Sequence, residues 1–173
     1  GYTVLVEGNM DVIACHQAGI ENAVAASGTA LGEEQLALLR RYGKEIRFFF
    51  DMDEAGQKAA RRSTELALGQ DIEALIISIP EGKDAADLAR EHPDALRQAI
   101  AHPEPALQYF LAQLVSRHDI ETPAGKKEVL AQFVPFIGAA KNEIDRSYWI
   151  KELAQAIRVE EKHLHGVVHS ARV

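Results

Sequence analysis

Apolar residues recur along residues 1–101 in short runs that alternate with longer stretches of helical periodicity. The short runs are rich in β-branched and aromatic residues, which favours strands, and they lie at residues 3–6, 22–26, 45–50 and 72–79. The helical stretches lie at residues 10–19, 32–42, 54–68 and 85–101. This alternation is typical of βαβ units and predicts a mostly parallel four-stranded sheet with helices on both faces.

The pattern changes at residue 102, where strand-like runs stop and helical periodicity continues to the end of the chain. The predicted helices lie near residues 104–118, 123–139, 143–157 and 159–168. Thr122, which precedes a proline, is the expected N-cap of the second of them. We therefore predict an α/β domain at residues 1–101 and an all-helical C-terminal subdomain at residues 102–173.

Composition narrows the class of protein. The 173 residues carry a formal charge of −7 and 47% of them are hydrophobic, so a sizeable core is expected and binding of nucleic acid by bulk positive charge is not. Cys15 is the single cysteine, which excludes an internal disulfide and a CxxC zinc site. The sequence has no long apolar run and no leader, so we expect a cytoplasmic protein without a membrane span. The opening "GYTVLVEG" suggests a piece of a longer protein.

Carboxylates follow three of the four predicted strands. They are Glu7 and Asp11 after the first strand, Asp51 and Asp53 after the third, and Asp84 and Asp87 after the fourth. The carboxyl ends of parallel strands meet at one edge of a sheet, so these side chains are expected to converge there. Carboxylate oxygens are the ligands that Mg²⁺ prefers, and a bound cation offsets their mutual repulsion.

Local spacing supports this interpretation. Asp51 and Asp53 are two residues apart, so on an extended segment their side chains point the same way. Gly8 allows a sharp bend after Glu7, and Gly56 allows a close approach behind the aspartate pair. Taken singly, each acid is more typical of a turn or a helix cap than of a metal site. The convergence of three segments is what favours a metal site.

Four segments together resemble a known family. "VEGNMDV", "ASGTAL", "FFFDMDEAGQKAA" and "IPEGKDAADLAR" occur in this order between residue 3 and about residue 90. They resemble the Toprim-containing catalytic core of DnaG-type bacterial DNA primases. The resemblance implies a Toprim fold followed by a helical subdomain, and a DNA-dependent RNA polymerase that makes short primers for DNA replication.

The resemblance also implies roles for individual residues. The expected catalytic residues are Glu7, Asp11, Asp51 and Asp53. The expected ligands of Mg²⁺ or Mn²⁺, two ions in the active complex, are Glu7, Asp11, Asp51, Asp53, Asp84 and Asp87. Gly8 and Lys83 are expected to help bind the nucleotide. The chain departs from the family pattern at Asn9, Met52 and Ala85, and the last of these leaves the role of Asp87 open.

The family further implies partners and missing parts. The expected partners are a single-stranded DNA template, ribonucleoside triphosphates and, through a domain absent from this chain, a replicative helicase. Zinc is expected only in a module that this chain lacks. We expect a monomer, and we expect the isolated chain to make little or no primer.

Other interpretations remain open at this point. A metal-dependent Toprim nuclease shares the acidic pattern, and a topoisomerase would need a transferring tyrosine in a longer chain. A haloacid-dehalogenase-type phosphatase would need Thr or Val where Ala55 stands, and would carry the aspartate pair on its first strand. A non-catalytic Toprim-like binding module is the alternative outside the enzymes.

Two groups of charged residues are expected to have no role in the site. Arg61 and Arg62 follow the aspartate pair by about two helical turns and are expected to form a solvated helix face. His163, His165 and His169 lack a cysteine or acid that would complete a tetrahedral metal site, so we expect a solvated, mobile terminus.

Overall fold

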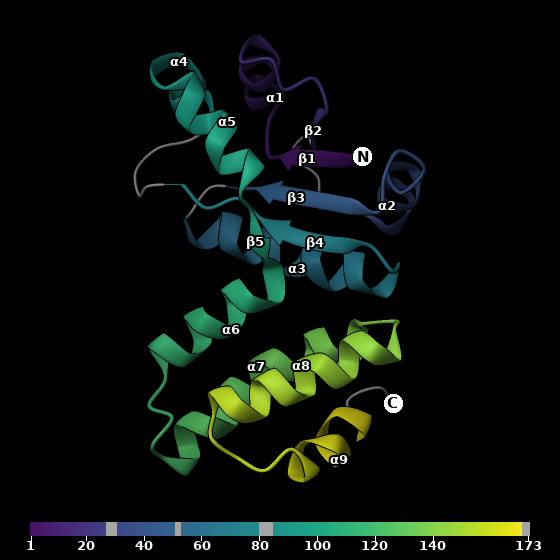
Figure 1. The fold of residues 1–173 in the computed structure, drawn as a ribbon, viewed down its shortest axis with the longest axis vertical. Coiled ribbons are helices and arrows are strands. Elements are labelled where there is room, and N and C mark those ends of the chain that lie inside the picture. The colour runs from purple at the N-terminus through teal and green to yellow at the C-terminus, as the bar shows by residue number, and fades with distance from the viewer. Residues whose placement is uncertain (27–30, 51–52, 80–84, 171–173) are drawn as a thin grey trace.

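The computed structural model describes residues 1–26, 31–50, 53–79 and 85–170. An α/β unit occupies one end of the elongated molecule and a helical unit the other (Figure 1). The α/β unit contains, in chain order, β1 (Tyr2–Val6), α1 (Asn9–Gln17), β2 (Ala23–Ala25), α2 (Glu33–Leu39), β3 (Glu45–Phe49), α3 (Glu54–Gly69), β4 (Glu73–Ile76), α4 (Ala85–Glu91) and α5 (Pro93–Ala101). The helical unit follows a short strand, β5 (Glu104–Pro105), and contains α6 (Ala106–Arg117), α7 (Pro123–Ala139), α8 (Glu143–Ala156) and α9 (Lys162–Ser170).

The sheet has the strand order β2-β1-β3-β4-β5. The first four strands are parallel, as predicted, and their register places Val6 beside Phe49 and Phe48 beside Ile76. The prediction of four strands was one short, because β5 pairs antiparallel with β4 at the edge of the sheet. Two residues are too few to produce a periodic pattern, and one of them is Pro105, a residue that sheets accept at an edge.

Helices cover both faces of the sheet (Figure 1). On one face, Val4, Val6 and Phe49 pack with apolar residues of α1, α4 and α5. On the other, Leu5 and Phe48 belong to a cluster that includes residues of α2 and α3. Adjacent residues of β1 and β3 thus point to opposite faces, which explains why both strands appear in the sequence as nearly continuous apolar runs.

The helical unit has the expected helices and shares a core with the sheet. Thr122 caps α7 by accepting a hydrogen bond from the backbone N–H of Gly125 at 3.1 Å. The cluster that contains Phe48 also contains Phe133 of α7 and Leu153 of α8, so apolar packing continues past residue 101. None of the helices in the described part of the chain is long and apolar enough to cross a membrane.

Arg61 on α3 connects the two units and is not part of a solvated face, contrary to the prediction. Its guanidinium lies 4.7 Å from the ring centroid of Phe136 on α7 and donates a hydrogen bond to the carbonyl oxygen of Gln132. Glu65, one turn further along α3, lies 3.5 Å from its Nε. Arg62 is exposed, as expected. The sequence pattern does not separate these neighbours because the partners of Arg61 are about seventy residues away.

The two neighbouring arginines provide a matched test of this contact. We expect Arg61→Ala to lower the free energy of unfolding by about 1–2 kcal/mol, since it removes a cation–π contact and leaves a backbone acceptor without its partner. Arg62→Ala should change it by less than about 0.5 kcal/mol. Urea denaturation measures both. Equal effects of the two substitutions would show that Arg61 does not connect the units.

Candidate functional site

The carboxyl edge of the sheet brings together acids from β1, α1 and α3. Glu7 directly follows β1, and Asp11 lies in the first turn of α1. Asp53 is the N-cap of α3, four residues after the end of β3. Because Val6 lies beside Phe49 in the parallel ladder, β1 and β3 end side by side, with Glu7 directly after β1. These three acids therefore lie along the same edge of the sheet, as expected from the sequence, and their role there stays a prediction.

Backbone amides orient two of the carboxylates. The N–H of Gly8 donates to Oδ2 of Asp11 at 3.0 Å, and the N–H of Gly56 donates to Oδ1 of Asp53 at 2.7 Å. Both acids lie at helix N-termini, where the free N–H groups and the helix dipole favour negative charge. The amide of Gly56 thus lies directly behind Asp53.

Of the other acids predicted for the site, only Asp87 lies among the described residues. Asp87 lies in the first turn of α4, and its Oδ1 is 2.6 Å from Nη2 of Arg90. This ion pair is exposed to solvent. To bind a metal ion, Asp87 would have to exchange Arg90 for the ion. Asp51, Lys83 and Asp84 lie outside the described residues.

The donor chemistry of the edge fits a hard divalent cation. Glu7, Asp11 and Asp53 offer carboxylate oxygens, which suit Mg²⁺ and Mn²⁺. Within the residues that the structure describes, no three His, Cys, Asp or Glu side chains are close enough together to hold a metal ion. A metal site at this edge would therefore need more acids than the described ones, and two of them are expected from the sequence to be Asp51 and Asp84.

The C-terminal histidines are exposed, as expected, but the segment that carries them is an ordered helix. Leu164 and Val168 of α9 are 2% and 4% exposed and belong to the same core cluster as α7. His165 lies 3.3 Å from Glu161, one turn earlier in the chain. The prediction of a mobile terminus was wrong, because the apolar spacing of Leu164 and Val168 gives α9 a face to bury.

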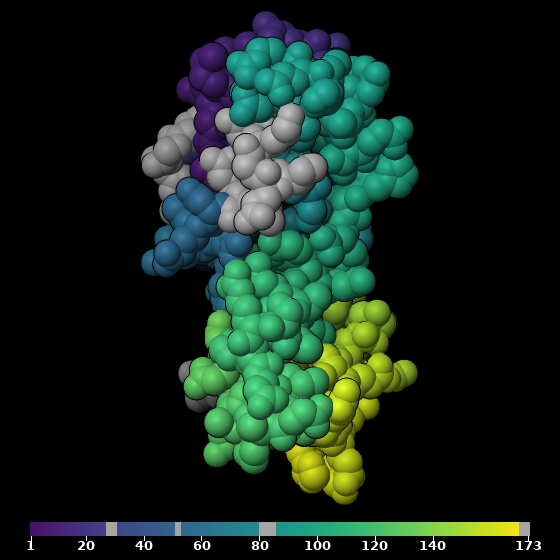
Figure 2. All heavy atoms as spheres, turned by 90° about the vertical axis from the view of Figure 1, so that its left-hand side faces the viewer, coloured from purple at the N-terminus to yellow at the C-terminus, as the bar shows by residue number. Residues whose placement is uncertain are grey.

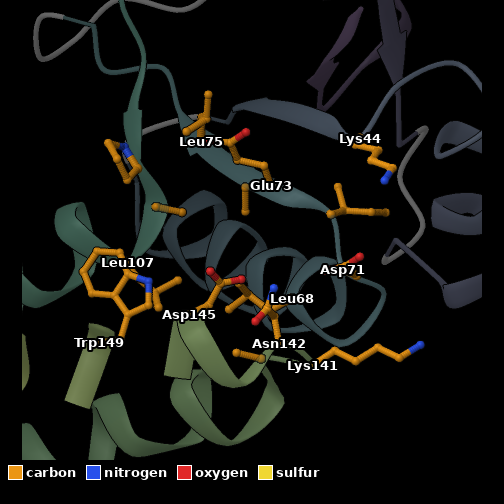
Figure 3. Close-up of a pocket in the computed structure, with 15 residues that line it drawn as sticks. Lys44, Leu68, Asp71, Glu73, Leu75, Leu107, Lys141, Asn142, Asp145 and Trp149 are labelled. Carbon is orange, nitrogen blue, oxygen red and sulfur yellow. The ribbon is translucent and has the colours of Figure 1, made fainter. Parts of the chain in front are cut away.

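A cavity of about 500 Å³ lies away from the carboxyl edge, where the N-terminal half of β4 faces the start of α8 (Figure 3). Its lining mixes charged and aromatic side chains, including Lys44, Glu73, Asp145 and Trp149. None of the acids predicted for the metal site lines it. The cavity is a feature of the junction between the two units.

Two family models match this chain. A model described as Toprim-like matches residues 4–89, and a model described as the DnaB-helicase binding domain of primase matches residues 107–161. The first covers β1 to α4 and therefore the acidic edge. The second covers α6 to α8, and its description names helicase binding, whereas helicase contact was expected from the sequence through a domain absent from this chain. Amphipathic helices show from their spacing which face is buried, but not which partner they bind, so the sequence pattern could not reveal this assignment.

Relatives and solved structures agree with both matches. A DNA primase of Streptomyces coelicolor is 34% identical over 177 aligned residues, which cover 90% of this chain and 28% of that protein. The crystal structure of a DNA primase domain from Pseudomonas aeruginosa superposes with a TM-score of 0.85 at 34% identity, covering 97% of this chain and 54% of the other. A DnaG primase catalytic domain bound to single-stranded DNA gives 0.81 at 28% identity, covering 94% and 53%. The chain thus spans little more than a quarter of the length of its full-length relative.

Cys15 is a buried residue of α1 that lies close enough to the acidic edge to sense it. Burial raises the pKa of its thiol from about 9 to about 11, with a smaller contribution from the negative charge of Asp11. The side chain is fully buried and packs among the apolar residues between the sheet and α1. It is therefore a protonated core residue at neutral pH.

The raised pKa has a consequence for stability at high pH. The unfolded thiol ionises near pH 9 and the folded one near 11, so the folded state binds more protons between these values. This contribution to stability is complete below pH 9 and decreases as the pH rises toward 11. We expect the unaltered chain to lose about 1 kcal/mol more than Cys15→Ala between pH 7.5 and pH 10, measured by urea denaturation. Equal losses would show that the folded thiol titrates like a solvated one.

Proposed function

This chain belongs to the DnaG-type bacterial DNA primase family, and we propose that its acidic edge is the nucleotidyl-transfer centre of a primer-synthesising RNA polymerase. The observation that carries the proposal is the placement of Glu7, Asp11 and Asp53 at adjoining ends of β1, α1 and α3. Because the chain covers only 28% of a full-length relative, this activity describes the whole protein, to which the chain contributes the centre.

The proposed partners follow from the same family. They are ribonucleoside triphosphates, a single-stranded DNA template, and a replicative helicase that contacts the region from α6 to α8. The similarity to a DnaG catalytic domain bound to single-stranded DNA supports the DNA template as a partner. The family model over residues 107–161 supports the helicase.

Each acid has a distinct proposed task. Asp11 and Asp53 bind Mg²⁺ or Mn²⁺ through the carboxylate oxygens that Gly8 and Gly56 orient. Glu7 serves as a further ligand or as the group that accepts a proton at the edge, since it directly follows the buried end of β1. When bound, two divalent ions would activate the attacking hydroxyl and stabilise negative charge on the transferred phosphoryl group.

Asp51, Asp84 and Asp87 complete the proposed ligand set. Gly8, the N-cap of α1, contributes to nucleotide binding next to the acids, and Lys83 does so as a point charge toward the triphosphate. All of these assignments extend the acidic edge along the segments that follow β1, β3 and β4.

Substitutions at Asp53 separate metal binding from folding. Asp53→Asn keeps a side-chain oxygen that caps α3 but removes the charge, so we expect the fold and the melting temperature to be retained and Mn²⁺ affinity to drop about tenfold. Asp53→Ala should lose the cap as well, at a cost of about 1 kcal/mol of stability. Mn²⁺ titration followed by electron paramagnetic resonance measures the affinity.

Asp94→Asn is the matched control, because Asp94 is an exposed acid in the first turn of α5 that pairs with Arg97 outside the edge. The Asp94→Asn variant should bind Mn²⁺ with the same affinity as the unaltered chain. If the chain binds no Mn²⁺ at millimolar concentration with its fold intact, the acidic edge is not a metal centre and a non-catalytic binding module is the better description.

The activity of the 173-residue chain by itself should be low. Template recognition in this family involves a zinc module and a basic region, and this chain has a single cysteine and a charge of −7. We therefore expect Mn²⁺ binding but little or no primer, measured as labelled ribonucleotide incorporation on single-stranded DNA. Robust synthesis by this chain alone would contradict the expectation.

A further inference from the structure

A cluster of hydrogen-bond donors joins the start of α3 to the exposed side of α6. We call the side chains of Gln57, Tyr109, Gln113 and Arg117 the α3–α6 donor cluster. In Figure 2, the side of the molecule that carries the carboxyl edge faces the viewer, and α6 lies directly below the start of α3. Gln57 follows Asp53 by four residues, which is about 6 Å along the helix axis. The cluster therefore adjoins the acidic edge.

Two hydrogen bonds within the cluster converge on one amide oxygen. Oε1 of Gln57 accepts hydrogen bonds from Nη2 of Arg117 at 3.1 Å and from Nε2 of Gln113 at 3.3 Å. Nε2 of Gln113 also lies 3.3 Å from the hydroxyl oxygen of Tyr109, which accepts from it. The two glutamines thus hold the guanidinium and the phenol near each other although they come from opposite ends of α6.

Donors of this cluster remain available to a ligand. Arg117 has five N–H groups and is exposed, and no carboxylate in the described part of the chain pairs with it. The Tyr109 hydroxyl accepts from Gln113, and among the described residues no acceptor takes its own proton. A cation and a neutral O–H donor that face one region of surface suit the oxygens of a phosphate group.

Charged groups at both ends of the cluster act on the hydroxyl of Tyr109. Burial raises the pKa of Tyr109, with a further contribution from Glu104, and Arg117 and Gln113 act in the opposite direction. The guanidinium is thus close enough to influence the phenol. Glu104 accepts a hydrogen bond from the hydroxyl of Ser78 at 2.9 Å, which holds its carboxylate at the β5 end of the cluster.

We propose that the α3–α6 donor cluster binds a backbone phosphate of the nucleic-acid strand that extends from the acidic edge toward the helical unit. The proposal rests on the nucleotidyl-transfer function proposed above and adds a binding subsite to it. Arg117 supplies the charge, Tyr109 a neutral donor, and Gln57 and Gln113 the orientation. A strand held at an acidic edge needs positive charge close by. Arg117 supplies this charge from α6, through its hydrogen bond to Gln57, which lies about one turn of α3 beyond Asp53.

Salt dependence of DNA binding tests the subsite. Fluorescence anisotropy would follow binding of the 173-residue chain to labelled single-stranded DNA and to the matching RNA–DNA duplex, between about 50 and 200 mM NaCl. We expect Arg117→Gln to weaken binding about fivefold at the lowest salt and to reduce the slope of log K against log salt by about 0.7 to 0.9. Tyr109→Phe should weaken binding about twofold and leave the slope unchanged, since no charge is lost.

Arg158→Gln is the matched control, because Arg158 is also exposed but pairs with Glu121 in the helical unit. It should retain the affinity and slope of the unaltered chain, and melting temperatures of all variants should agree within a few degrees. An Arg117→Gln effect on single strands alone assigns the phosphate to the template, and an effect on the duplex alone assigns it to the primer–template product.

Equal behaviour of Arg117→Gln and Arg158→Gln, or no DNA binding by the unaltered chain at the lowest salt, would overturn the subsite. Neither result affects the metal centre, which Mn²⁺ titration tests independently. Arg117→Gln should keep its Mn²⁺ affinity, so a failure of the subsite and a failure of the proposed function are distinguishable.

Discussion

The parallel pairing of β1 with β3 is the constraint on which the candidate site depends. Its register places Val6 beside Phe49, so β1, which Glu7 directly follows, and β3, which ends four residues before Asp53, end side by side. Both strands are buried on both faces, and a slip of one residue would exchange the side chains that face the two cores. The acids are therefore held at a fixed separation by apolar packing, and the amides of Gly8 and Gly56 then orient two of them.

Much of this arrangement could be predicted from the sequence because the determinants are local. Alternating apolar runs define the strands, and acids directly after a run must lie at the carboxyl edge of a parallel sheet. Thr122 and Asp53 are helix caps whose signal lies within three residues of the helix start. The elements that the sequence did not reveal depend on distant partners: β5 pairs across the chain with β4, and Arg61 contacts α7. Periodicity carries no information about such pairings.

The helical unit is joined to the sheet by a shared core, which gives the edge and the bundle a defined relative position. Phe110 stacks on Phe136 with ring centroids 5.0 Å apart, and both belong to the cluster that reaches Phe48 in β3. Arg61 and the backbone contact from Lys141 to Leu68 add polar connections between α3 and the bundle. This rigidity is what allows α6 to present Arg117 beside Gln57, so that a helix outside the sheet can contribute to the surface next to the acids.

The central claim is that the carboxyl edge of the sheet is a divalent-metal centre. Anomalous diffraction from crystals of this chain soaked in Mn²⁺ tests it most directly, because the peak locates the ion without reference to activity. The account predicts a peak within coordination distance, about 2 to 2.5 Å, of carboxylate oxygens among Glu7, Asp11 and Asp53. A peak only elsewhere, such as the cavity beside Trp149, or no peak at millimolar Mn²⁺, would contradict it.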